Sequence, residues 1–195
     1  MIKKIFWSLE DLKWNIRCRY NYWLHGPYGL AKMVEAMPFK YRIKYLRKYG
    51  AEIGKRCIID SGFKIHRPAR MKPFKNLTIG NDVYLGHNLL LDLTDKIIFE
   101  DNTAMGANCQ IWTHVGDYLE DQHDKSDYEE RIAPVIIKRG AVCYSSVILN
   151  PGVVIGERSR VFAMGMVNRS VPANEIWAGI PSKSIKARSG KLVAK

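Results

Sequence analysis

The sequence lacks paired cysteines. Its four cysteines, Cys18, Cys57, Cys109 and Cys143, lie at least 34 residues apart, and none belongs to a C-x-x-C pair. This spacing disfavours a disulfide framework or a structural zinc site, and it favours reduced thiols in a cytoplasmic protein.

Long apolar runs are also missing. No segment approaches the roughly 18 consecutive apolar residues of a membrane-spanning helix, so we expect no such helix. Residues 1–9 include Lys3 and Lys4 but no apolar run of about 7–15 residues followed by a cleavage site, so we expect no secretory signal.

Acidic residues are scarce at the start of the chain. Residues 1–50 hold 11 Lys or Arg against three acids, and so contribute +8 of the formal net charge of +12. They also hold 11 of the 21 aromatic residues. Ile5, Leu9, Leu12 and Ile16 recur at helical spacing, which predicts an amphipathic helix near the N-terminus.

Two interpretations of residues 1–50 stay open. Interleaved Trp, Lys and Arg suit an anionic membrane surface, where aromatic rings lie at headgroup depth and cations pair with lipid phosphates. The same residues suit a helical cap that packs its aromatic side chains on the rest of the fold. We expect a cytoplasmic protein that can lie on the inner face of the membrane, and no nucleic acid as a partner.

The stretch from Val135 to Pro172 repeats with a period of six. Neither a helix, with about 3.6 residues per turn, nor a strand, with a period of about two, produces this repeat. A period of six indicates a parallel β-helix, in which residues 18 apart stack and fill the axis. The repeated apolar positions are Ile137, Cys143, Leu149, Ile155, Val161 and Val167.

The same repeat runs from Ile53 to Ile111 with two slips, and it is lost before Ile137. The intervening segment is polar and acidic, so we expect residues 112–134 to protrude as a loop, and loops on a rigid scaffold often carry function. The fold class is therefore mainly β. The expected regions are a basic, aromatic-rich helical extension at 1–50, a β-helix at 51–171, and a C-terminal loop with a short basic tail at 172–195.

Three motifs carry a resemblance to the hexapeptide-repeat acyltransferases. They are IGNDVYLGHN at residues 79–88, ILNPGVVIG at 148–156 and VPANEIWAGIPSKSIK at 171–186. The last two resemble the galactoside, maltose and polysaccharide O-acetyltransferases. Over about residues 50–187 the resemblance implies a left-handed parallel β-helix and a homotrimer with sites between subunits. It also implies acetyl transfer from acetyl-CoA to a hydroxyl, with no metal required.

The resemblance places the catalytic base at His114, which follows Thr113 at the mouth of the expected loop. A sugar hydroxyl attacks a thioester only as its proton is removed, and imidazole, with a pKa near 6.5, is mostly unprotonated and still basic at neutral pH. His123 is a rival base, and Asp117 could hold the imidazole tautomer. A solvated loop residue is the alternative for both.

The resemblance also implies contacts with CoA. Ser145 and Ala163 fall on positions that touch the pantetheine arm. Cations suit the 3′-phosphate and diphosphate, although a solubilising tail is the alternative. Trp177 could flank the adenine or cover the end of the core. The positions near the adenine and the ribose phosphates are Asn168, Arg169, Lys183 and Lys186.

Two departures from the family pattern leave the acyl group open. Tyr144, Phe162 and Met164 stand where the family has glycines facing the pantetheine channel. Either these side chains turn away, or the channel is reshaped for another acyl group.

For the acceptor, Asn88 and Asp92 lie near the family's substrate positions, where a sugar hydroxyl would suit both. They could instead cap turns. We expect a saccharide of cell-envelope or polysaccharide biosynthesis. The basic residues 1–50 would favour a lipid-linked or polyanionic glycan.

Other activities stay open on the same fold. Loops set the acceptor, so N-acetylation of an amino sugar or O-acetylation of serine is an alternative, and a non-catalytic scaffold is another. A γ-type zinc carbonic anhydrase is disfavoured because His87, His114 and His123 do not have the spacing of its three ligands.

Overall fold

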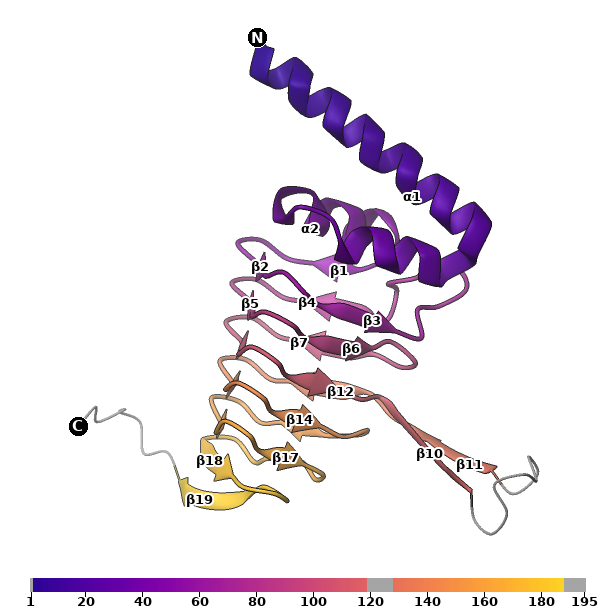
Figure 1. The fold of residues 1–195 in the computed structure, drawn as a ribbon. Helices are drawn as coiled ribbons and strands as arrows, with labels where there is room; N and C mark the ends of the chain where they lie inside the picture. The colour runs from indigo at the N-terminus through magenta and orange to yellow at the C-terminus, as the bar shows by residue number, and fades with distance from the viewer. Residues whose placement is uncertain (1, 119–127, 188–195) are drawn as a thin grey trace.

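The computed structural model describes residues 2–118 and 128–187, and it describes side chains there except at 2–8, 117–118, 128 and 186–187. The described chain forms successive coils that stack into a three-sided column, and each side of the column is a parallel sheet (Figure 1). Sheet A holds β1 (Glu52–Ile53), β4 (Leu77–Ile79), β7 (Ile97–Phe99), β12 (Val135–Ile137) and β15 (Val154–Ile155). Sheet B begins with β2 (Ile58–Ile59), β5 (Tyr84–Leu85), β8 (Ala104–Met105), β13 (Val142–Cys143) and β16 (Arg160–Val161). Sheet C holds β3 (Lys64–His66), β6 (Leu90–Asp92), β9 (Gln110–Ile111), β14 (Ile148–Leu149) and β17 (Met166–Val167).

The six-residue repeat produces this column because each repeated apolar side chain points to the axis. Ile137 pairs with Ile155 and Leu149 with Val167 in parallel register, and all four are buried. The predicted stacking of residues 18 apart is therefore confirmed, and so is a mainly β fold built of parallel sheets. The four cysteines are free, as their spacing predicted.

Close stacking of the coils demands glycine at some corners. At Gly106 a Cβ atom would lie 2.6 Å from the backbone nitrogen of Ser145 in the next coil, closer than real Cβ contacts. The glycine is needed for this approach rather than for a left-handed backbone. The left-handed corner residues include asparagines such as Asn88 and Asn108, whose φ angles are 57° and 59°.

Two helices cover the N-terminal end of the column (Figure 1). Helix α1 (Ile2–Glu35) bends sharply at Gly26, where φ is 63°, and α2 (Phe39–Lys48) follows it. Arg42 of α2 is buried and donates hydrogen bonds to the carbonyl oxygens of Ile59 and Met37. The helical cap is thus tied to the second strand of the first coil. Within the described residues, neither helix is long and apolar enough to cross a membrane.

Between β9 and β12 the chain leaves the column as an antiparallel hairpin, β10 (His114–Tyr118) and β11 (Tyr128–Ile132), which projects from one corner (Figure 1). At the other end of the chain, β18 (Glu175–Ala178) joins sheet B beside β16, and β19 (Lys183–Ala187) pairs antiparallel with β18. Trp177 is buried there in register with Val161, so it closes the end of the apolar axis.

Candidate active site

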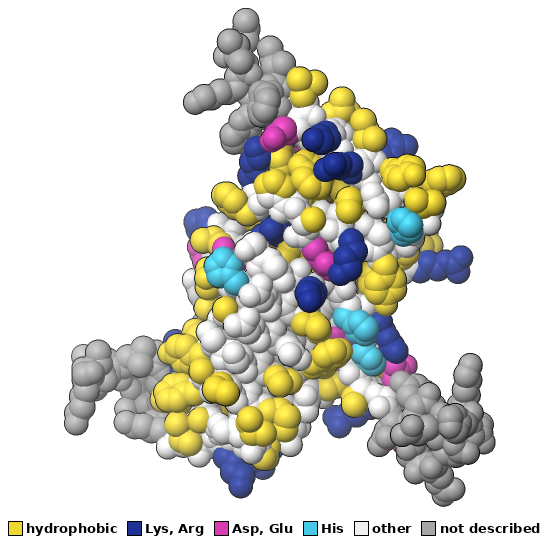
Figure 2. Space-filling view, in the orientation of Figure 1, with side chains coloured by type: hydrophobic (Ala, Val, Ile, Leu, Met, Phe, Trp, Pro, Cys, Tyr) yellow, Lys and Arg dark blue, Asp and Glu magenta, His cyan; other side chains and the backbone are white. Residues whose placement is uncertain are grey.

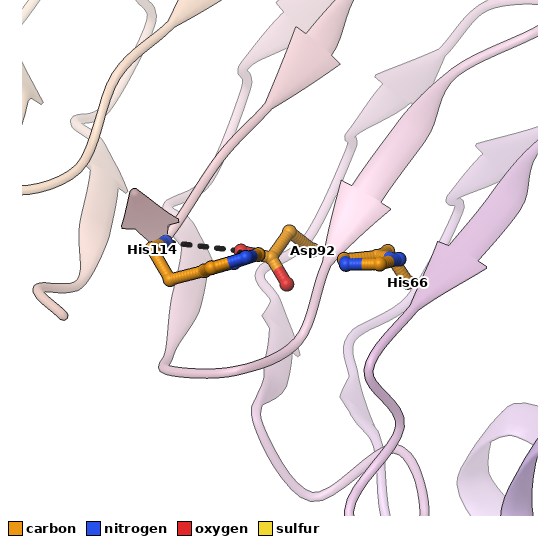
Figure 3. A group of neighbouring side chains, drawn as sticks. All are labelled: His66, Asp92 and His114. Atoms are coloured by element: carbon orange, nitrogen blue, oxygen red, sulfur yellow. Dashed lines mark hydrogen bonds and ion pairs between the residues drawn. The ribbon is translucent and has the colours of Figure 1, made fainter. Parts of the chain in front are cut away.

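The corner at the end of sheet C brings together polar side chains from three coils. His66 ends β3 and pairs in register with Asp92, the last residue of β6. His114 follows β9 after two residues and begins the hairpin. Figure 3 shows Asp92 between the two histidines, with a hydrogen bond to His114. Residues far apart in sequence therefore meet because consecutive coils place their strand ends at the same corner.

Asp92 is the buried centre of this group, with 0% of its surface exposed. Its Oδ2 accepts hydrogen bonds from the backbone N–H groups of Thr113 (2.8 Å) and His114 (3.0 Å), and its Oδ1 accepts one from the Thr94 hydroxyl (2.7 Å). Burial alone would raise the pKa of Asp92. Hydrogen bonds from His114, Thr94 and Thr113 outweigh burial, so the pKa lies below its usual value and the carboxylate stays charged.

The imidazole of His114 is oriented by this carboxylate. Its Nδ1 lies 2.6 Å from Asp92 Oδ2, and 12% of its side chain is exposed. A carboxylate accepts hydrogen bonds and does not donate them, so the geometry assigns a proton to Nδ1. The neutral ring then has an unprotonated Nε2, which is the atom able to take a proton from a substrate.

His66 packs flat against His114. The ring centroids are 5.4 Å apart with an interplanar angle of 17°, and Trp112 meets both rings edge-on. Burial lowers the pKa of His66, against the opposing attraction of Asp92, and this favours its neutral form. The stacked ring restricts rotation of His114. The sequence gives little indication of this contact. Its one sign is that His66 ends a hexad one coil before Asp92.

A pocket of about 410 Å³ opens beside His114 on the face of sheet C. Strands β9 and β14 of sheet C and the base of the hairpin form its walls. Arg67, which follows His66, forms an ion pair with Glu130 of β11 and so ties the hairpin to the first coil. The pocket is lined by Gln110, Trp112, His114, Val115, Gly116, Ile148, Asn150 and Pro151.

The same three side chains are close enough together to hold a metal ion. His66, Asp92 and His114 can each offer one ligand atom, and these atoms lie within 4.8 Å of one another. Both oxygens of Asp92 already accept hydrogen bonds from the backbone or from side chains, and one holds His114 Nδ1. The donor set therefore fits a hydrogen-bonded imidazole–carboxylate pair better than a metal centre.

The two residues predicted to bind the acceptor have different surroundings. Asn88 is exposed at a corner of the column, and it donates to Asn108 (3.3 Å) beside a second cavity of about 290 Å³. That cavity shares Gln110 with the pocket at His114. Asp92 has no exposed surface with which to contact a sugar, and its oxygens are occupied. Contact with His114 thus replaces the predicted contact with the acceptor.

The residues predicted to touch pantetheine lie away from this pocket in a single chain. Ser145 and Ala163 are exposed at corners between sheets B and C, before the strands of sheet C begin. Neither lines the pocket, which lies along β9 and β14 and the base of the hairpin. The bulky residues that replace family glycines point outward beside them. The rings of Tyr144 and Phe162 meet edge-on at 5.6 Å, and Met164 is also exposed.

The residues predicted near the adenine and phosphates lie at the C-terminal end of the column. Asn168 and Lys183 are exposed, and the guanidinium of Arg169 lies 5.2 Å from the centroid of the Trp177 ring. The side chains of Lys186 and Asp117, and the whole of His123, fall outside the described residues.

No protein-family model matches the chain. Curated proteins and solved structures are similar to it, among them the following. WcaF of Escherichia coli K12, named for acetyl transfer in colanic acid biosynthesis, is 27% identical over 77% of this chain and 76% of its own. A galactoside O-acetyltransferase of Lactococcus lactis is 31% identical over 72% of this chain and 64% of its own.

One of the solved structures is a hexapeptide-repeat acetyltransferase of Vibrio cholerae in complex with acetyl-CoA. It superposes with a TM-score of 0.72 at 20% identity, over 84% of this chain and 87% of its own, which shows that the two share a fold. In sequence, therefore, the chain is similar to curated proteins named as acetyltransferases, and in fold it is similar to a hexapeptide-repeat acetyltransferase; together these confirm the resemblance carried by its three motifs and the prediction of an acyltransferase.

Proposed function

We propose that the protein transfers an acetyl group from acetyl-CoA to a hydroxyl of a saccharide, with His114 as general base. The observation that carries this proposal is the 2.6 Å contact between His114 Nδ1 and the buried carboxylate of Asp92, at the wall of an open pocket. A fixed, neutral imidazole with a free Nε2 is the group that deprotonation of a hydroxyl requires.

The proposed reaction follows from this arrangement. As the acceptor oxygen bonds to the thioester carbonyl carbon, its proton moves to His114 Nε2, and the imidazolium is stabilised by Asp92. The carbon–sulfur bond then breaks, and CoA leaves as a thiol after taking the proton from Nε2. His66 keeps the ring in place throughout.

The donor site is proposed to span two copies of the chain. Ser145 and Ala163 lie away from the pocket of their own chain, so a neighbouring copy would bring its own pair to His114. We infer a left-handed column assembled as a trimer, as the family resemblance of the three motifs implies. Asn168, Arg169, Lys183 and Lys186 would then meet the adenine and phosphates.

A saccharide acceptor is supported by the pocket and by the relatives together. The pocket is lined by Trp112 and Pro151, which offer apolar faces to a sugar ring, and by the amides of Gln110 and Asn150, which suit hydroxyls. The relatives are named for galactosides and for colanic acid biosynthesis. Asn88, beside the adjoining cavity, would contact a further part of the acceptor.

The test is acetyl-CoA turnover against a panel of sugars. His114→Ala should lower kcat by about 10²–10⁴-fold, the contribution of general-base catalysis, with unchanged affinity for CoA. His87→Ala is the matched control because His87 is an exposed histidine of the same column that bonds Ser61 instead. Unchanged turnover in His114→Ala would remove His114 from the mechanism.

A further inference from the structure

The face of α1 that points away from the protein carries a stripe of exposed apolar side chains. Trp23 is 80% exposed and Ile16 is 59% exposed, although both are of the types that folding usually buries. We call this set the outer stripe. It consists of Leu9, Leu12, Ile16, Tyr20 and Trp23.

The acidic residues of the first part of α1 lie on its opposite face, which packs against α2. Glu10 pairs with Lys40 of α2 at 2.8 Å, and Asp11 pairs with Lys44 at 2.5 Å. Cys18, on the same face, is fully buried. The helical cap predicted from sequence therefore uses this inner face alone, and it leaves the outer stripe uncovered by the described chain.

Among the described residues, the charged side chains that border the outer stripe are cations. At about 100° per residue, Lys13 and Arg17 fall on one side of the stripe and Arg19 on the other, and all three are exposed. Glu10 and Asp11 are the acids of residues 9–25, and both face α2. Figure 2 shows basic and hydrophobic side chains side by side over the helical end of the molecule.

We propose that the outer stripe binds an anionic lipid bilayer, with the first part of α1 lying in the plane of the interface. Apolar side chains would enter the acyl boundary, Tyr20 and Trp23 would lie at headgroup depth, and the bordering cations would pair with lipid phosphates. A second copy of α1 is a poorer occupant, because two such faces would oppose cation to cation without any acid between them. This inference does not depend on the proposed acetyl transfer.

The apolar part is tested by flotation of the full-length protein with vesicles of phosphatidylglycerol and phosphatidylcholine. Ile16→Ser should weaken binding about tenfold or more, because serine lacks most of the apolar surface that would enter the acyl boundary. Ile185→Ser is the matched control: Ile185 is 57% exposed on β19, at the far end of the column (Figure 1). Equal loss in both variants would overturn the proposal.

The electrostatic part uses charge reversal. Lys13→Glu should weaken binding to the anionic vesicles about tenfold or more at low salt, because the reversal removes an attraction to the lipid phosphates and adds a repulsion. Lys96→Glu, on the column, should not weaken it. Tryptophan emission should shift to shorter wavelength on binding, and less so in Trp23→Phe. Failure of the wild type to float with anionic vesicles would overturn the proposal. So would equal binding to neutral vesicles, or dissociation of an oligomer by Ile16→Ser without lipid binding.

Discussion

At the scale of single residues, the site depends on a carboxylate that no solvent reaches. Asp92 satisfies backbone donors of Thr113 and His114 and also holds the His114 ring. A sugar ligand at this position would have needed an exposed side chain. Because Asp92 is buried, we propose that it positions His114, and its contribution to activity should then act through the tautomer of His114.

Asp92→Asn tests this role. The amide has nearly the same shape, but one of its two acceptor oxygens becomes an NH₂ group, so it cannot accept from Thr94 and from the donors at Oδ2 together, and the negative charge that would stabilise an imidazolium is lost. We expect kcat to fall by about 10²-fold or more, with KM for the acceptor almost unchanged. A large rise in KM with unchanged kcat would instead restore Asp92 to acceptor binding.

The same carboxylate predicts how stability depends on pH. Because the pKa of Asp92 is lowered in the folded state, its contribution is present above the unfolded pKa and is lost as pH falls through the folded value. Urea unfolding from neutral to acidic pH should therefore show a loss of stability that is smaller in Asp92→Asn.

At the scale of elements, the column is made of very short strands, so the corners carry much of its specificity. Sheets A, B and C consist mainly of strands of two or three residues, held by registers that repeat from coil to coil. A methyl group added where two corners touch should therefore lower the free energy of unfolding by more than the size of the group suggests.

Gly106→Ala tests the corners. The added Cβ would meet the backbone of Tyr144 and Ser145 at 2.6–2.8 Å, which neither can relieve by a rotamer change. We expect the free energy of unfolding to fall by about 1–3 kcal/mol. Ala163→Ser, at an exposed corner, should change it by less than about 0.5 kcal/mol. Equal effects, measured by urea unfolding at one protein concentration, would contradict the close-approach argument.

At the scale of the whole molecule, the separation of His114 from Ser145 and Ala163 within one chain predicts a site shared between copies. Mixing two inactive variants should then restore activity. His114→Ala removes the base, and Ala163→Trp blocks the pantetheine position. In randomly mixed trimers, about a quarter of the interfaces would have His114 from an Ala163→Trp chain and Ala163 from a neighbouring His114→Ala chain, and so hold a complete site.

The measurement is turnover after the two variants are unfolded and refolded together. Recovery toward about a quarter of wild-type activity supports a shared site. If each chain held a complete site, the mixture would be no more active than either variant refolded alone.

The amino-acid sequence by itself determined the column, and through the family resemblance it singled out His114 as the predicted base. Apolar residues at every sixth position leave few other ways to bury Ile137, Leu149 and Ile155 on one axis, and the loss of that repeat marks where the hairpin departs. His114 was singled out because the family resemblance places a catalytic histidine at that departure, and its role as base stays a prediction.

Only the tertiary structure decided what surrounds the base and which face of α1 is free. His66, Asp92 and His114 meet because coil stacking superposes strand ends more than twenty residues apart, and no local pattern encodes how buried each will be. Likewise, sequence alone allowed residues 1–50 to be a cap or a membrane surface. Packing on α2 assigned Glu10, Asp11 and Cys18 to the cap and left the outer stripe exposed, because a helix can bury only the side that its neighbour covers.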